Sequence, residues 1–460
     1  MLFSSLEFLY LFLPLTLVIY FAVPKFLRNG VLLAASIVFY AYGEIRLLWV
    51  MLLTVALNYG FGLAIGVAKS AVVKRALLIF AVSLNVGALV LFKYTDLLLE
   101  TAGIKPLGIV LPLGISFYIF QAMSYVIDVW RGEVEAQRSP VTFGAYVMMF
   151  PQLVAGPIVR YRDVEQELKH RRISVADVAE GIGIFAVGLA KKVLLANKAG
   201  EMRQIFLSAG EGYVSVLGEW LALICYAFQI YYDFGGYSDM AVGLGRIFGF
   251  SFPRNFNYPY ISKSITEFWR RWHITLSTWF REYVYISLGG NRCRKARMYF
   301  NLFITWLLTG LWHGAEWNFT LWGIYFFLVL VIEKTFLGKA VARLPKVFQH
   351  SYALFFILVG WLIFTSDDGL GVIRFGRLFG IGADSFSNGY VNYELLRHVV
   401  ILCIMAIGAT PVPRLLTEKI KLRTCAAWHI IKNILIPAGL VLSTASLAGS
   451  SYNPFLYFRF

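Results

Sequence analysis

The sequence predicts an all-α membrane protein that crosses the bilayer many times, because it is strongly apolar, has long apolar runs and carries few charges. The chain has 460 residues, of which 59% are hydrophobic and 15% are charged, and its mean hydropathy is +0.67. Soluble domains are about half apolar and about a quarter charged. A spanning helix takes roughly 20 apolar residues, so the chain has room for about a dozen spans.

The apolar runs divide the chain into predicted helices. Two stretches, 140–158 and 234–252, are apolar but interrupted by Pro or by several Gly, and we expect re-entrant segments there. No internal repeat or low-complexity linker is visible. We therefore expect one membrane domain over 1–460, with a core over 1–430 and a C-terminal helix and tail over 431–460. We expect helices near 8–23, 29–42, 47–66, 76–92, 108–130, 178–195, 214–232, 299–312, 317–332, 351–365, 395–412 and 433–449.

The distribution of Lys and Arg predicts which loops face the cytoplasm. Cytoplasmic loops carry excess positive charge, and basic residues concentrate at 254–297, 333–350 and 414–432. We place these segments inside, so that 366–394 and both chain termini lie outside the cytoplasm. The same excess accounts for most of the net charge of +16, and we expect membrane lipids rather than nucleic acid as partners.

The charges also favour a re-entrant path for 140–158. If this segment spanned fully, the basic residues near 25–28 and 74–75 would lie outside the cytoplasm. If it enters and returns to the same side, they lie inside, as the charge rule prefers. Irregular backbone at membrane depth is tolerated only where it is buried in protein or lines a cavity. A cavity is therefore implied.

Several common catalytic signatures are absent from the sequence. It contains no GxxxxGK[ST] phosphate loop, no HExxH zinc motif and no GxSxG nucleophile elbow. The four cysteines have neither CxxC nor Cys/His spacing, so we predict no metal site and no disulfide framework. The histidines remain as the candidates for catalysis.

His313 is the first candidate, in the segment TGLWHGAEWNFTLWG between two strongly apolar runs. A titratable side chain at membrane depth is costly and is a functional candidate by default. Gly310 and Gly314 allow close backbone approach, and Trp312 and its neighbouring tryptophans can wall a pocket. A neutral imidazole there can accept a proton from an attacking hydroxyl. The alternative is an interfacial histidine among belt tryptophans.

His273 is the second candidate, in EFWRRWHITLSTWFREYVY. Trp269, Trp272, His273 and Leu276 recur at helical spacing with arginines on the other face. The pattern predicts an amphipathic helix lying along the inner membrane surface. Periodicity leaves open whether His273 is catalytic or only a polar residue of that helix.

Asp233 and Asp239 interrupt an apolar, Gly-rich region, YYDFGGYSDMAVGLG, that we expect to line the same cavity. Buried carboxylates usually pair with a cation or a backbone donor. Arg246 and Arg254 are nearby candidates, and a structural ion pair is the simplest explanation of each Asp taken alone.

The chain ends in NPFLYFRF. Aromatic residues at a membrane boundary are common, and an aromatic belt is the default interpretation. However, Tyr457 would lie outside the cytoplasm with a nucleophilic hydroxyl, and tyrosine can carry covalent intermediates.

Together these segments resemble the membrane-bound O-acyltransferase (MBOAT) family, and within it the bacterial branch that O-acetylates alginate. They cover much of 1–330 in the family's order, whereas 335–430 offers little beyond apolar spans. No single segment is specific, but the set is. The matching segments are MLFSS, LPLGISFYIFQAMSYVIDVWRG, FPQLVAGPIVRY, YYDFGGYSDMAVGLG, GFSFPRNFNYPYISKSITEFWRRWHITLSTWFREYVYISLGGNR and LTGLWHGAEWNFTLWG.

The resemblance implies a fold and an activity. The expected fold is a ring of about 12 tilted transmembrane helices around a central tunnel in the bacterial cytoplasmic (inner) membrane. His313 matches the family's catalytic histidine, and His273 matches the second functional histidine of the polysaccharide branch. We expect Trp312, Asn318, Asp233, Asp239 and Gln229 to line the tunnel.

The resemblance also implies the reactants. Acetyl-CoA or another acyl thioester would be the cytoplasmic donor, with no bound cofactor. The acetyl group would pass to an extracytoplasmic SGNH-type acetyltransferase that works with the polysaccharide synthesis machinery. The ending FLYFRF is similar to the C-terminal motif of a helper peptide in teichoic-acid D-alanylation, in which a tyrosine is proposed to take the acyl group. That similarity makes Tyr457 a candidate acyl relay.

Other functions stay open from the sequence. The same chemistry could serve peptidoglycan or teichoic acid, and the acceptor cannot be identified from these motifs. A transporter or scramblase of an activated donor also fits broken helices and intramembrane carboxylates, although no inverted repeat is visible. A third alternative is a structural scaffold for a polysaccharide synthase, for which His313 would be dispensable.

Overall fold

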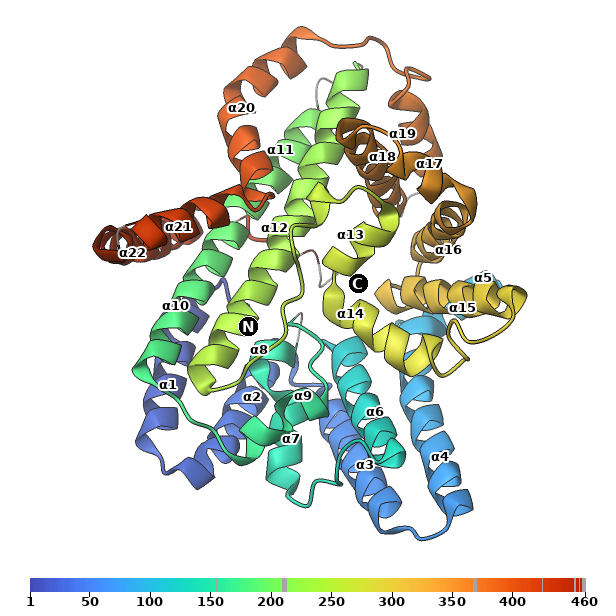
Figure 1. Cartoon of the computed structure of the whole chain (residues 1–460), viewed down its shortest axis with the longest axis vertical. Coiled ribbons are helices and arrows are strands. Elements are labelled where there is room, and N and C mark those ends of the chain that lie inside the picture. The colour runs from blue at the N-terminus through green and yellow to red at the C-terminus, as the bar shows by residue number, and fades with distance from the viewer. Residues whose placement is uncertain are drawn as a thin grey trace. The chain divides into compact units, whose positions relative to one another are not determined.

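The computed structural model of the chain is helical almost throughout (Figure 1). It describes residues 1–153, 156–208, 213–366, 370–423, 425–450, 452–454 and 456, without the side chains of 422–431. Within these residues, the only β structure is an isolated bridge between Ser215 and Ser385. The predicted all-α class is confirmed.

The chain divides into two compact units, and the helix α12 contributes to both. Unit 1 comprises Met1–Leu189 and Tyr237–Arg254, and unit 2 comprises Ala190–Gly236 and Asn255–Phe460. One membrane domain over 1–460 stays a prediction.

Unit 1 is built from helices whose aromatic side chains pack together. Phe3 stacks on Tyr237 with ring centroids 4.4 Å apart, and Phe12 meets Phe150 edge to face at 5.3 Å. Its elements are η1 (Phe8–Phe12), α1 (Leu13–Ala22), η2 (Lys25–Leu27), α2 (Arg28–Glu44), α3 (Leu48–Val67), α4 (Ala71–Leu89), η3 (Val90–Tyr94), α5 (Thr95–Thr101), α6 (Ile115–Arg131), α7 (Pro140–Met148), α8 (Phe150–Leu153), α9 (Tyr161–Lys169) and α10 (Val175–Ala190).

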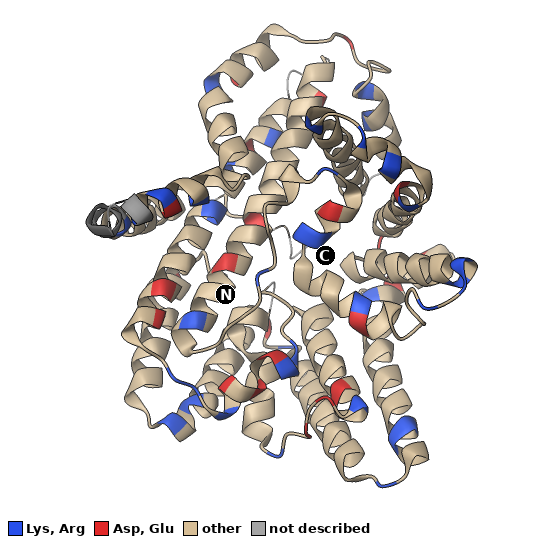
Figure 2. Ribbon diagram, in the orientation of Figure 1, with Lys and Arg blue, Asp and Glu red and all other residues tan. Residues whose placement is uncertain are grey.

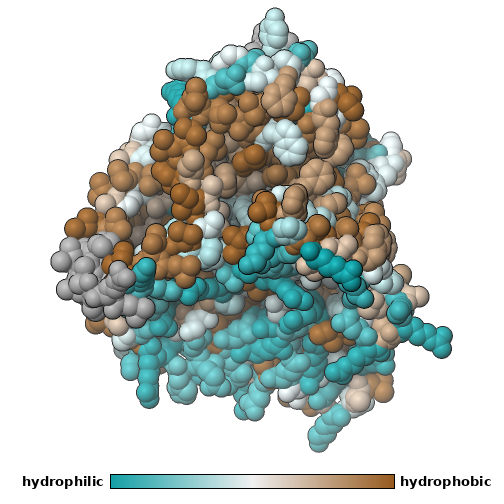
Figure 3. Space-filling view, turned by 45° about the horizontal axis from the view of Figure 1, so that its top comes forward, coloured by the Kyte–Doolittle hydropathy of each residue, from teal (hydrophilic) through white to brown (hydrophobic). Residues whose placement is uncertain are grey.

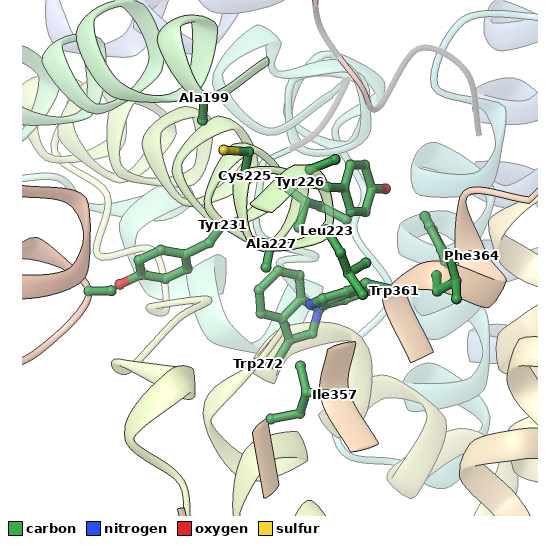
Figure 4. Packing of buried hydrophobic residues seen from close by; sticks show 14 of the residues in the cluster. Ala199, Leu223, Cys225, Tyr226, Ala227, Tyr231, Trp272, Ile357, Trp361 and Phe364 are labelled. Atoms are coloured by element: carbon green, nitrogen blue, oxygen red, sulfur yellow. The ribbon is translucent and has the colours of Figure 1, made fainter. Parts of the chain in front are cut away.

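Unit 2 contains a large buried aromatic cluster, which Figure 4 shows from close by. Trp272 and Trp361 lie side by side in it, with ring centroids 4.8 Å apart. Its elements are η4 (Lys191–Ala196), α11 (Asn197–Leu207), the first part of α12 (Val216–Phe248), η5 (Pro259–Ile261), α13 (Ile265–Arg271), α14 (Ile274–Trp279), η6 (Phe280–Tyr285), α15 (Lys295–His313), α16 (Trp317–Ile332), η7 (Glu333–Leu337), α17 (Gly338–Ala342), α18 (Lys346–Phe364), α19 (Gly371–Arg377), α20 (Gly389–Gly408), α21 (Val412–Arg423) and α22 (Cys425–Gly449).

Seven of the helices in the described residues are long and apolar enough to cross a membrane. Apolar side chains on these helices are exposed. Leu396 and Val400 of α20 are 74% and 69% exposed, and Val441 of α22 is 66% exposed. Figure 3 shows a broad apolar area beside a hydrophilic zone on the face that it draws. The chain is therefore a multi-pass membrane protein. The seven helices are 25–44, 48–67, 71–101, 317–342, 346–364, 389–408 and 432–449.

Charged side chains are sparse along these helices and concentrate near their ends (Figure 2). The turn between α3 and α4 illustrates this, because Lys69 lies in it and Lys74 and Arg75 lie in the first turns of α4. Such an arrangement keeps cations at the membrane boundary, where they cost little.

Every predicted apolar run contains a helix, with one notable difference in length at 108–130. There the helix α6 begins only at Ile115. Gly108 and Gly114 adopt φ angles of 69° and 70°, a left-handed conformation that interrupts a helix. The prediction overlooked the two glycines and Pro112 between them.

The re-entrant break that we predicted at 234–252 is wrong, because α12 runs without interruption for 33 residues, from Val216 to Phe248. Glycines inside a helix cost up to about 1 kcal/mol each, but here they permit tight packing. A Cβ on Gly243 would lie 2.6 Å from the carbonyl oxygen of Gly181 in α10. Close helix approach therefore overrides the low helix propensity.

The other predicted re-entrant stretch, 140–158, contains two short helices. α7 has 9 residues and α8 has 4. At about 1.5 Å per residue, neither can cross a bilayer alone. A re-entrant path for this stretch stays a prediction.

Candidate active site

His313 is the last residue of α15, and glycine packing between α15 and α16 fixes its position. A Cβ on Gly310 would lie 2.4 Å from the carbonyl oxygen of Phe319, and a Cβ on Gly323 would lie 3.2 Å from the Cα of Gly310. Directly after His313, a Cβ on Gly314 would lie 2.2 Å from the Phe319 ring. The two helices therefore approach as closely as their backbones allow at the point where the imidazole projects, as the sequence predicted.

Aromatic rings surround the His313 side chain, which is 6% exposed. Its ring centroid lies 5.0 Å from Trp322 and 5.2 Å from Phe364, and both rings stand nearly perpendicular to the imidazole. Trp312 packs on it at 5.0 Å. Such walls exclude water, and exclusion of water strengthens electrostatic interactions at the imidazole.

The continuous amphipathic helix that we predicted around His273 is wrong. α13 ends at Arg271, α14 begins at Ile274, and His273 lies at the break with φ 43° and ψ 54°. Its side chain is 1% exposed and therefore does not lie on a membrane surface. A non-glycine residue in the left-handed region is strained, and such strain is concentrated at functional sites.

Asn255 holds this break in place. The backbone N–H of Ile274 donates to the carbonyl oxygen of Asn255 over 2.9 Å. The side-chain oxygen of Asn255 lies 3.0 Å from Nδ1 of His273 and accepts from the hydroxyl of Thr275 at 2.9 Å. A local hydrogen-bond network thus replaces the missing helical turn and directs the imidazole inward.

The two histidines share one aromatic neighbour. The ring of Trp312 lies 5.9 Å from His273 and 5.0 Å from His313. His273 lies outside the seven candidate spans, and burial holds its pKa well below its usual value, helped by the charge that His313 would carry. A lowered pKa keeps an imidazole neutral at physiological pH, which is the form that accepts a proton.

A buried carboxylate anchors α13. Glu333, 7% exposed, accepts the backbone N–H groups of Ile265 and Thr266 over 2.8 and 2.9 Å. These are orphan donors at the helix N-terminus, where a negative charge is favourable. Ser264 caps the same helix by accepting the N–H of Glu267. The N-terminus of the helix that leads to His273 is therefore fixed by Glu333 and Ser264.

A cavity of about 690 Å³ lies within unit 2 beside α13, α15 and η7. Its inner wall includes Trp269 and Thr309, which lies one helical turn before His313. The Trp269 ring lies 5.4 Å from Trp322, which in turn contacts His313. One aromatic ring thus separates the cavity wall from the imidazole. Four cationic side chains line the cavity: Lys263, Arg270, Arg281 and Lys334.

Asp233 forms a buried ion pair with Lys192. Nζ of Lys192 lies 2.8 Å from Oδ1 of Asp233, and the two side chains are 2% and 3% exposed. Lys192 also donates to the side chain of Asn197 at 2.9 Å. A structural ion pair is confirmed for Asp233, but Arg246 or Arg254 as its partner is wrong, because the partner is a lysine 41 positions earlier in the chain.

Arg246 instead forms ion pairs within unit 1. Its guanidinium lies 2.8 Å from Asp177 and 3.3 Å from Glu180, which bind it to α10. Arg246 lies 13 residues after Asp233, and within the continuous helix α12 that separation is nearly four turns.

Pro454 and Leu456 of the C-terminal tail bind to the Lys192–Asp233 pair. Nζ of Lys192 donates to the carbonyl oxygen of Pro454, and Asp233 accepts the backbone N–H of Leu456 at 2.9 Å. Leu456 also packs against the buried cluster of unit 2. The ion pair therefore binds the tail through main-chain groups, and Tyr457, which follows in sequence, lies outside the described residues.

Gln229 also holds this segment. Its side chain hydrogen-bonds the hydroxyl of Tyr452, and Asn197 donates to the carbonyl oxygen of Tyr452 at 3.4 Å. Gln229 and Asp233 stand one turn apart on α12 and thus both contact the tail. We had expected both side chains to line a tunnel.

The remaining predicted lining residues differ in position. Trp312 lies between the two histidines, and Asn318, 7% exposed, donates to the carbonyl oxygen of Phe364 at 3.0 Å. Phe364 is a ring neighbour of His313, so Asn318 supports the same aromatic wall. Asp239 belongs to unit 1 and is half-buried.

Sequence reasoning missed Lys192 and Asn255. Lys192 lies within an apolar run, and a cation in such a run is a signal in itself. Asn255 carried no comparable signal, because its role depends on contacts with a segment 18 residues later. Among the described residues, no group of three or more His, Cys, Asp or Glu is placed to hold a metal ion.

Comparison with known proteins identifies relatives over the full length of the chain. Residues 37–366 match the membrane-bound O-acyltransferase family, MBOAT. The chain is 38% identical to the probable alginate O-acetylase AlgI of Azotobacter vinelandii, over 100% of both chains. It is 41% identical to the probable AlgI of Pseudomonas aeruginosa, over 80% of this chain and 72% of the relative. It is also 32% identical to a peptidoglycan O-acetyltransferase of Helicobacter pylori, over 80% of this chain and 77% of the relative.

Proposed function

Because the chain belongs to the membrane-bound O-acyltransferase (MBOAT) family, we propose that it moves an acetyl group from a cytoplasmic thioester across the membrane for O-acetylation of an extracytoplasmic polysaccharide. The observation that carries the proposal is the placement of His313, buried among aromatic rings and one ring away from a cavity lined by cations. Full-length similarity to alginate O-acetylases supports an exopolysaccharide such as alginate as the acceptor.

The cavity in unit 2 is the proposed donor site, with acetyl-CoA as the donor. Lys263, Arg270, Arg281 and Lys334 supply positive charge for the phosphates of coenzyme A. The apolar wall formed by Trp269 and Trp306 suits the pantetheine arm. No bound cofactor is needed for this reaction, because the thioester itself supplies the activated acyl group.

The proposed reaction begins with proton transfer to His313. A nucleophilic hydroxyl gives its proton to the imidazole and attacks the thioester carbonyl, forming a tetrahedral intermediate. The C–S bond then breaks, and the leaving thiolate takes the proton from the imidazolium. The products are an acyl ester and a free thiol, and His313 is neutral again.

We further propose Tyr457 as the hydroxyl that receives the acyl group. Support comes from the tail, because Asp233 holds Leu456 and the next residue on α12, Phe234, contacts His273 at 4.7 Å. The acyl-tyrosine ester would then pass the acetyl group to a hydroxyl of an extracytoplasmic SGNH-type acetyltransferase. In the competing mechanism, a serine of that partner attacks the thioester directly.

Replacing Tyr457 with Phe separates the two mechanisms. Under the relay, Tyr457→Phe abolishes polysaccharide acetylation while the protein still folds, since only one hydroxyl is removed. Full acetylation by Tyr457→Phe excludes the relay and leaves the direct attack. Tyr452→Phe is the comparison in the same tail, because it removes the bond to Gln229 but leaves the Tyr457 hydroxyl, and we expect it to retain more acetylation than Tyr457→Phe.

The family and the membrane spans also support a location in a membrane. We propose the bacterial cytoplasmic membrane, with the basic segments 254–297, 333–350 and 414–432 inside and both termini outside. Under this orientation, the donor cavity opens to the cytoplasm and the tail lies toward the acceptor.

Release of free coenzyme A tests the enzymatic proposal. Purified protein in detergent should release thiol from acetyl-CoA when a hydroxyl acceptor is present, and His313→Ala should lower this rate by at least about 100-fold. Movement of acetyl-CoA without His313-dependent thiol release would favour a transporter. Acetylation in cells that is unchanged by His313→Ala would favour a scaffold.

A further inference from the structure

The hydrogen bonds around Asn255 determine which nitrogen of His273 carries the proton. The side-chain oxygen of Asn255 accepts the backbone N–H of Thr275 at 3.3 Å and its hydroxyl at 2.9 Å. A backbone N–H can only donate, so the Asn255 atom at this point is the oxygen and not the amide nitrogen. The ambiguity that normally attends an asparagine side chain is thereby removed.

The same oxygen lies 3.0 Å from Nδ1 of His273. An amide oxygen has no hydrogen to give, so Nδ1 must be the donor and must carry the proton. In a neutral imidazole, Nε2 is then the nitrogen with the lone pair. The left-handed backbone at His273, φ 43°, and the Ile274 N–H bond to Asn255 hold the ring in this position.

We propose that Asn255 is a positioning residue, which fixes His273 as the Nδ1–H tautomer so that Nε2 serves acyl transfer. The role of His273 in transfer rests on the proposed function, whereas the tautomer does not. His313 is a titratable neighbour of His273, and the ring neighbours Phe234, Phe256 and Trp312 carry no charge. Asn255 distinguishes Nδ1 from Nε2 through its hydrogen bond at Nδ1.

Two substitutions of Asn255 separate positioning from a general structural role. Asn255→Leu removes the acceptor at similar size, and we expect kcat to fall by about 10- to 100-fold with the KM for acetyl-CoA unchanged. Asn255→Asp keeps an oxygen acceptor and adds a negative charge that favours the imidazolium. We expect it to restore activity at alkaline pH and to move the acidic limb of the pH–rate profile to higher pH.

Asn257→Leu is the matched control, because Asn257 lies two residues further on with an exposed side chain, and it bonds Arg271 through its backbone. We expect Asn257→Leu to have the same kcat and the same pH–rate profile as the wild type. Equal loss in Asn257→Leu and Asn255→Leu, or an Asn255→Asp variant as inactive as Asn255→Leu at every pH, would overturn the positioning role.

The tautomer itself is measured by nitrogen NMR of protein labelled with 15N-histidine, with the His273 signals assigned by their loss in His273→Gln. The wild type and Asn257→Leu should show a protonated Nδ1 and an unprotonated Nε2. A protonated Nε2 in the wild type contradicts the inference, even if Asn255→Leu does not fold. If the tautomer is found but His313→Ala leaves transfer unchanged, the proposed function fails and the tautomer assignment stands.

Discussion

Lys192 and Asp233 form an ion pair across 2.8 Å in which neither side chain is more than 3% exposed. The pair joins the π-helical turn η4 to α12, and it also binds the carbonyl oxygen of Pro454 and the N–H of Leu456 in the tail. π-helical turns are often found at functional sites. A buried charge pair that depends on a terminal segment couples the stability of unit 2 to the position of that segment.

The first prediction concerns this pair. Lys192→Met leaves Asp233 as an uncompensated buried charge, which costs about 3–5 kcal/mol. We expect a lower midpoint of thermal unfolding in detergent and faster proteolysis of the tail. Replacing both partners, Lys192→Met with Asp233→Leu, should recover part of the stability but not the protection of the tail.

Lys198→Met is the control for that experiment. Lys198 and Glu201 form an ion pair at 2.9 Å on the same stretch of chain, but their side chains are 40% and 37% exposed. Exposed pairs contribute about 0–1 kcal/mol, so the unfolding midpoint should hardly change. Equal destabilisation by Lys192→Met and Lys198→Met would contradict the importance of the buried pair.

The second prediction concerns the glycine contact that positions His313. Gly310→Ala places a methyl group against the Phe319 carbonyl oxygen, where a Cβ would lie at 2.4 Å, and must push α15 away from α16. Displacement of a catalytic group by about 1 Å can cost about 100-fold in rate. We expect thiol release to fall strongly while the protein remains membrane-inserted.

Gly87→Ala provides the comparison, because a Cβ at Gly87 in α4 meets nothing within 4 Å. Alanine has the higher helix propensity by up to about 1 kcal/mol, so this variant should be as stable as the wild type or more so, and fully active. Wild-type thiol release by Gly310→Ala would show that the close approach is not required.

The third prediction concerns the cationic lining of the cavity. Arg281→Gln removes one charge-assisted contact to a phosphate, worth about 1.5–3 kcal/mol, and should raise the KM for acetyl-CoA by about 10- to 100-fold with little change in kcat. Added salt should also raise the KM of the wild type for acetyl-CoA, because ions screen the attraction between the cationic side chains and the phosphates.

Arg292→Gln tests whether this effect is specific. Arg292 is exposed and belongs to the same basic segment, but it does not line the cavity. The KM of Arg292→Gln for acetyl-CoA should equal that of the wild type. A similar rise in both variants would indicate a diffuse electrostatic effect and not a donor site.

Much of the fold could be predicted from the sequence because a bilayer imposes simple rules. Apolar runs of spanning length must be helical, and every predicted run contains a helix. The packing at Gly310 and Gly314 beside His313 was also predictable, because a titratable residue between two apolar runs stands out against its neighbours.

Two of the errors, at α12 and at His273, share one physical cause, which is contact between segments distant in sequence. The continuity of α12 depends on the approach of Gly243 to Gly181, and helix propensity contains no such information. The break at His273 depends on Asn255, and helical periodicity on either side of the break concealed it. Both require the tertiary structure, which local patterns do not describe.

The most direct test of the account uses sealed inside-out vesicles that contain the protein together with its extracytoplasmic partner. Labelled acetyl-CoA is added outside, at the cytoplasmic face, and a polysaccharide acceptor is enclosed within. The account predicts label on the enclosed acceptor with the wild type and none above background with His313→Ala, at equal protein content. Equal labelling by the two proteins would contradict it.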